Sequence, residues 1–138
     1  MTDWTITKRL EFDAGIDAVW RAITDPAELS LWFGDGADFD PTPGTDGAMV
    51  WENHGRYAVR VEESSPPNRL VWSWMHEPNA AFDSAHATRV EWSLSVRPGG
   101  GTALELRESG FLTATHYDDN NGGWDEELGE LRTLLGAV

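Results

Sequence analysis

The chain has 138 residues, of which 40% are hydrophobic and none is cysteine, and 24 acidic residues outweigh 10 basic ones to give a net charge of −14. This length predicts a single domain over residues 1–138, and the lack of cysteine excludes disulfides, thiolate metal sites and a cysteine nucleophile. The acidic surface repels phosphate backbones and anionic lipid, so we expect no nucleic-acid partner and no membrane partner.

We expect no targeting signal at the start of the chain. Residues 1–12 include an acid, Asp3, and alternate between polar and apolar residues, unlike a signal or transit peptide. No apolar run in the sequence approaches the roughly 20 residues that span a bilayer. We therefore expect a cytoplasmic protein.

The first part of the chain predicts one strand followed by two short helices. Residues 4–12 alternate between apolar and polar side chains, which is typical of a strand. Apolar residues then recur at the spacing of a short amphipathic helix, namely Ile16, Val19, Trp20 and Ile23.

The second helix has its own start signal. Asp25 is placed as an N-cap, Pro26 as the first helical residue and Glu28 as the reciprocal acid of a capping box. We expect this helix to end at about Trp32 or Phe33.

Residues 34–47 are rich in Asp, Pro and Gly and predict a loop. Turn-like separators divide the following segment into alternating patterns, so we expect antiparallel strands joined by hairpins. The expected strands cover residues 48–53, 57–63, 70–76, 88–97 and 102–110.

A long helix closes the chain. Its apolar residues recur at helical spacing, namely Trp124, Leu128, Leu131 and Leu135. Gly122 and Gly123 weaken a helix by roughly 1 kcal/mol each relative to alanine, so we expect them to mark its start or a kink.

Four stretches of sequence, in this order, carry a family resemblance: "AVWRAITDPAELSLWFG", "SSPPNRLVWSW", "GGGTALELRESGF" and "NGGWDEELGELRTLL". Together they resemble the homologues of the activator of the heat-shock-protein-90 ATPase, within the START-like or SRPBCC superfamily. The resemblance implies an α+β helix-grip fold. In that fold a curved six-stranded antiparallel sheet wraps round the long helix, two short helices follow the first strand, and a cavity commonly lies between sheet and helix.

The segment "LVWSWMH" decides what the inner face of this sheet presents. Strand alternation places Trp72, Trp74 and His76 on one face, while Val71 and Met75 make the other face apolar too, so a one-residue slip would invert it. Large aromatics pack with gaps, and ligand pockets combine apolar walls with a few polar groups. The expected ligand-binding residues are Trp32, Tyr57, Trp72, Trp74, His76, Trp92, Leu106, Glu108, Trp124 and Leu128.

The alternative interpretation is a filled core, with His76 and Glu108 at wet strand ends. Metal and cofactor sites are not expected. The acidic loop lacks calcium-loop spacing, and its members are Asp35, Asp38, Asp40 and Asp46. The histidines show no zinc-type pairing.

Three classes of function remain. The first is binding of a small apolar or aromatic molecule between the sheet and the last helix. The second is an enzyme of the cyclase or dehydratase kind, in which Glu108 and His76 act as acid and base, as in some relatives in the superfamily. The third, a chaperone partner, is disfavoured because no stretch identifies an interaction surface. A homodimer is compatible with each of them.

Overall fold

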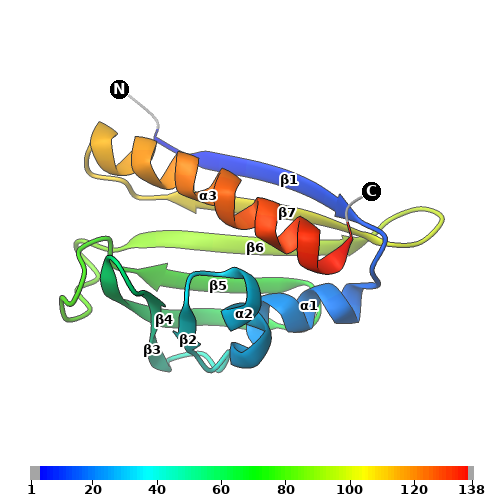
Figure 1. The fold of residues 1–138 in the computed structure, drawn as a ribbon, viewed down its shortest axis with the longest axis horizontal. Helices are drawn as coiled ribbons and strands as arrows, with labels where there is room; N and C mark the ends of the chain where they lie inside the picture. The colour runs from blue at the N-terminus through cyan, green and yellow to red at the C-terminus, as the bar shows by residue number, and fades with distance from the viewer. Residues whose placement is uncertain (1–3, 137–138) are drawn as a thin grey trace.

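A computed structural model describes residues 4–136 and shows an antiparallel sheet packed against one face of a long C-terminal helix (Figure 1). This arrangement confirms the expected helix-grip fold. In chain order the elements are β1 (Ile6–Phe12), α1 (Ile16–Thr24), α2 (Pro26–Trp32), β2 (Gly36–Asp38), β3 (Asp46–Trp51), β4 (Gly55–Ser65), β5 (Arg69–Trp74), β6 (Thr88–Val96), β7 (Thr102–Ser109) and α3 (Ala114–Leu135).

The sheet has seven strands in the order β1-β7-β6-β5-β4-β3-β2, so the expectation of six was wrong. The additional strand is β2, which pairs with β3 from Gly36 opposite Val50 to Asp38 opposite Ala48. It lies in the segment that predicted a loop, because three residues rich in Gly and Asp carry no strand signal. Gly47 permits this pairing, since a Cβ at that position would overlap the carbonyl oxygen of Asp38.

The inner face of the sheet follows the alternation of β6 and β7. The registers place Trp92 opposite Leu106 and Val90 opposite Glu108, and all four side chains are buried. The next strand, β5, continues this face, because Trp72 pairs with Val90. A bulge in β4 between Val61 and Glu63 shifts the register there, and the predicted inward orientation of both β5 indoles is confirmed by their ring contacts inside the core.

The two short helices close one end of the sheet. Asp25 caps α2 by accepting a hydrogen bond from the backbone N–H of Ala27 at 2.8 Å, as expected. Its own N–H donates to the carbonyl of Arg21, so Glu28 does not form the expected reciprocal bond and lies instead 3.6 Å from the Arg21 guanidinium. At the end of α2, Trp32 donates from Nε1 to the carbonyl of Ala22 and anchors the two helices to each other.

The long helix begins earlier than expected. Thr113 is its N-cap and accepts from the N–H of His116 at 3.1 Å, and the helix continues through Gly122 and Gly123 to Leu135. The expectation that these glycines mark its start was wrong, because the Thr113 cap starts the helix two turns earlier and both glycines lie inside it. Within residues 4–136, no helix combines the length and the apolar character needed to cross a membrane.

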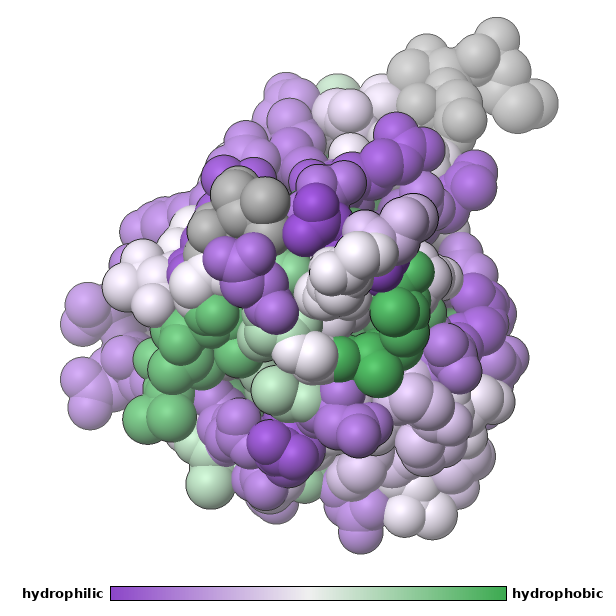
Figure 2. Space-filling view, turned by 90° about the vertical axis from the view of Figure 1, so that its right-hand side faces the viewer, coloured by the Kyte–Doolittle hydropathy of each residue, from purple (hydrophilic) through white to green (hydrophobic). Residues whose placement is uncertain are grey.

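One end of the molecule has a mainly hydrophilic surface. Figure 2 shows the end of the molecule at which the C-terminal part of α3 lies, where hydrophilic residues surround smaller groups of hydrophobic ones. Across the described residues the large hydrophobic side chains with high exposure are Leu31, Val96, Leu112 and Leu134.

Replacing Gly122 with alanine should stabilise the protein. Gly122 lies inside α3, and a Cβ there would meet no atom within 4 Å. We expect Gly122→Ala to raise the free energy of unfolding by about 1 kcal/mol in urea titrations. The matched control is Gly101→Ala, which should destabilise because Gly101 has φ +84° and a Cβ there would overlap the carbonyl oxygen of Phe12. A loss of stability in Gly122→Ala would contradict the helical environment described for this position.

Candidate functional site

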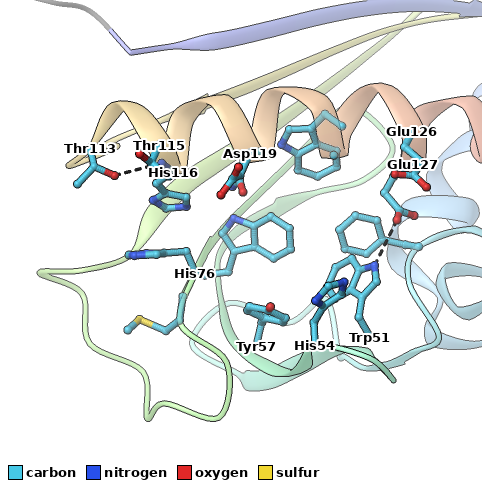
Figure 3. Close-up of a pocket in the computed structure, with 16 residues that line it drawn as sticks. Trp51, His54, Tyr57, His76, Thr113, Thr115, His116, Asp119, Glu126 and Glu127 are labelled. Carbon is cyan, nitrogen blue, oxygen red and sulfur yellow. Dashed lines mark hydrogen bonds between the residues drawn. The ribbon is translucent and has the colours of Figure 1, made fainter.

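An open cavity of about 720 Å³ lies between α3 and the inner face of strands β3, β4 and β5 (Figure 3). Aromatic side chains form much of the sheet side, and polar side chains of α3 form the opposite side. The lining residues are Phe33, Trp51, His54, Tyr57, Trp74, Met75, His76, Thr113, Thr115, His116, Asp119, Asn120, Gly123, Trp124, Glu126 and Glu127.

The aromatic wall is built by ring packing across three elements. Phe33, which follows α2, stacks on Trp74 of β5 at 5.6 Å and on Trp124 of α3 at 5.4 Å between ring centroids. Trp51 and Tyr57 meet edge to face at 5.5 Å and 84°, which gives the cavity a corner with two aromatic sides. Because each ring is held by its neighbours, the wall is preformed.

Glu108 lies behind this wall and is fully buried. Its carboxylate accepts hydrogen bonds from Trp74 Nε1 at 2.8 Å, Trp124 Nε1 at 2.7 Å, Asn120 Nδ2 at 3.1 Å and the hydroxyl of Thr88 at 2.5 Å. Burial raises the pKa of Glu108, and the four donors oppose that rise. The carboxylate thus joins β5, β6, β7 and α3 at one point.

The helix directs one stripe of residues towards the cavity. These residues follow helical spacing, namely His116, Asn120, Trp124 and Glu127. Glu127 accepts from Trp51 Nε1 and from the backbone N–H of Gly34, both at 3.2 Å, and it therefore links α3 to β3 and to the end of α2. Burial raises the pKa of Glu127, with the two donors opposing.

Two histidines form the other end of the cavity. The His116 ring stacks on the ring of His76 at 3.8 Å between ring centroids (Figure 3). Phe111 meets the His116 ring edge to face at 4.7 Å. His116 is only 7% exposed, and its Nε2 has no hydrogen-bond partner among the described residues. Burial, together with the neighbouring His76, lowers the pKa of His116 to about 4, although Asp119 acts in the opposite direction. His116 is therefore neutral at pH 7.

The expected ligand-binding residues divide into two groups. Those that line the cavity are Tyr57, Trp74, His76 and Trp124. Those that lie outside its lining, in the core or behind the wall, are Trp32, Trp72, Trp92, Leu106, Glu108 and Leu128. The division arises because strand alternation identifies an inner face, whereas the docking of α2 and α3 decides which part of that face stays open.

Sequence reasoning missed several residues of the cavity. His116, Asn120 and Glu127 share one face of α3, and the Thr113 cap was the signal that would have placed them on a helix. Trp51 shares strand parity with the buried Met49, which pointed to an inward orientation.

The Glu108 network should be essential for stability. In Glu108→Gln one buried indole or hydroxyl donor loses its acceptor, so we expect a loss of about 2–4 kcal/mol in the free energy of unfolding. The control is Glu105→Gln on the same strand, whose carboxylate forms a largely exposed ion pair with Arg9; its effect should stay within about 0.5 kcal/mol. Urea melts of both variants check this, and equal losses would contradict the network.

His116 should make stability depend on pH. Its pKa in the folded protein, about 4, lies below the ordinary 6.5. As pH falls from 6.5 towards 4, His116 takes up a proton in the unfolded chain but not in the folded chain. The free energy of unfolding therefore decreases by up to about 3 kcal/mol. His116→Phe keeps a ring at this position and removes the His116 contribution to the pH dependence of stability. The surface variant His86→Asn keeps that contribution. Parallel stability curves for wild type and His116→Phe between pH 7 and pH 4.5 would refute the assignment.

Comparison with known proteins places the chain in one family. No curated protein matches it. Among solved structures, it is similar to protein MLL2253 from Mesorhizobium loti, with 25% identity and a TM-score of 0.83 over 95% of this chain and 96% of that one. It is also similar to CalU16 from Micromonospora echinospora, with 27% identity and a TM-score of 0.74 over 96% of this chain and 76% of that one.

A third similar structure is that of the Aha1 dimer from Colwellia psychrerythraea in solution, with 18% identity and a TM-score of 0.79 over 98% of this chain and 96% of that one. This likeness shows the shared fold. The family model described as "Activator of Hsp90 ATPase homolog 1-like protein" matches residues 13–136, which is nearly the whole chain. The chain therefore belongs to the family of Activator of Hsp90 ATPase homolog 1-like proteins.

Proposed function

We propose that this protein binds a small hydrophobic or aromatic molecule in the cavity between its sheet and α3. The observation that carries the proposal is an open space of about 720 Å³ with preformed aromatic walls. Small-molecule sites typically occupy roughly 300–1,000 Å³ and combine apolar walls with a few polar groups. The family and its structural neighbours fit a fold with this capacity.

Asn120 supplies one of the orienting polar groups. Its Nδ2 donates to Glu108, which fixes the amide and leaves Oδ1 as an acceptor for a donor group of the ligand. At the end of the cavity, His76 and His116 add imidazole nitrogens. The ligand is therefore held by aromatic surface along its length and by hydrogen bonds at defined points.

The geometry favours binding over the acid–base alternative. That alternative requires Glu108 and His76 to converge on one ligand atom. Glu108 is fully buried behind the Trp74 and Trp124 indoles and does not line the cavity, whereas His76 is exposed at its end. A homodimer stays a separate proposal, supported by the dimeric state of the Colwellia structure with the same fold.

Filling the cavity from α3 tests the proposal. Gly123 lines the cavity and a Cβ there meets no atom within 4 Å, whereas the adjacent Gly122 is exposed and lies outside the lining. A leucine at 123 would occupy ligand space, and a leucine at 122 would not. Both substitutions improve helix propensity equally, so Gly122→Leu is a matched control.

The measurement is a thermal-shift screen of small aromatic compounds, followed by titration of tryptophan fluorescence. A compound that binds the folded state raises Tm by mass action. We expect binding to wild type and Gly122→Leu, and at least about tenfold weaker binding to Gly123→Leu, the loss expected when a large side chain fills a ligand pocket. Equal binding to the two variants, or no binding compound at all, would overturn the proposal. Recovery of the compound unchanged separates binding from turnover.

A further inference from the structure

The lining of the cavity carries acidic side chains and no lysine or arginine. Three of its lining residues are acidic, Asp119, Glu126 and Glu127, and none is lysine or arginine. No lysine or arginine within residues 4–136 forms an ion pair with any of these carboxylates, whereas most basic residues pair with acids elsewhere on the surface. The site thus holds negative charge that no basic side chain of the described chain neutralises.

Aromatic faces lie opposite these carboxylates. Figure 3 shows Asp119 and Glu126 on α3, and Trp51 and Tyr57 on the strands across the cavity. Glu127 reaches across and is hydrogen-bonded to Trp51. The edge-to-face corner of the two rings presents π surface, and indole and phenol faces attract cations. Carboxylates on one side and aromatic faces on the other both favour a positively charged occupant.

The histidine end of the cavity does not oppose this charge. His116 is more than nine-tenths buried and its Nε2 has no partner among the described residues. Because its pKa is lowered to about 4, the imidazole is neutral at pH 7 and one of its two nitrogens is an acceptor. It therefore lines this end of the cavity without adding positive charge.

We infer that the ligand is an organic cation, an aromatic or apolar body bearing a protonated amine that lies between the Trp51–Tyr57 corner and the Asp119 and Glu126 carboxylates of α3. The inference rests on the proposed function, because it concerns the occupant of the same cavity. It adds that this occupant is positively charged.

Three probes with a common phenyl body and different charge test the inference at pH 7: 2-phenylethylamine, which is cationic, 2-phenylethanol, which is neutral, and 3-phenylpropionate, which is anionic. Isothermal titration calorimetry gives the three affinities. We expect the amine to bind about tenfold more tightly than the alcohol, and the propionate to bind most weakly. If the alcohol or the propionate binds as tightly as the amine, the cation inference fails and the proposed binding function stands. If none of the three binds, the cation inference fails, and the thermal-shift screen alone decides the proposed binding function.

Charge-matched variants separate the cavity from the general acidity of the chain. Asp119→Asn and Glu126→Gln each remove one carboxylate from the lining, whereas Asp118→Asn and Glu130→Gln each remove one exposed carboxylate of the same helix outside it. All four variants change the net charge equally. We expect amine affinity to fall about three- to tenfold in the first two only, and to fall by more than alcohol affinity does in the same variants. Equal losses in all four would assign the attraction to net charge and overturn the inference.

Discussion

The buried carboxylate of Glu108 is the contact on which the arrangement of this protein depends. One side chain on β7 accepts hydrogen bonds from donors on β5, β6 and α3, and these include the indoles that form the cavity wall. A buried carboxylate is costly without partners, so the sheet and the helix must approach in the one arrangement that supplies all of its donors. The position of α3 over the sheet, and hence the existence of the cavity, follows from satisfying this group.

The cavity has two chemically different sides because its walls come from different kinds of element. The strands contribute side chains by alternation, and their inner positions beside the cavity carry the aromatic rings of Trp51, Tyr57 and Trp74. The helix contributes a stripe whose residues change from histidine through asparagine and tryptophan to glutamate along α3. A ligand therefore meets an apolar surface on the sheet and a graded polar surface on the helix, which is an arrangement that orients as well as holds.

Much of the fold could be predicted from the sequence, because strong alternation in β6 and β7 defines an inner face without reference to anything else. Glu108 was placed inward by that parity, yet its partners Thr88 and Asn120 could not be predicted, since they depend on how separate elements dock. The division between Trp72 in the closed core and Trp74 at the cavity was equally hidden, because both residues lie on the same face of β5. Strand β2 was missed because hydrogen bonding to β3, and not side-chain pattern, creates it.

The two carboxylates that join α3 to the rest of the protein differ in how firmly they hold it. Glu108 is enclosed and accepts from the two indoles at 2.7 and 2.8 Å, whereas half-buried Glu127 accepts from Trp51 and Gly34 at 3.2 Å. Longer and wetter hydrogen bonds yield first to thermal motion. We therefore expect α3 to be held more firmly at Asn120 and Trp124 than at Glu127, so that the side of the cavity next to Trp51 is the first to adjust to the size of an occupant.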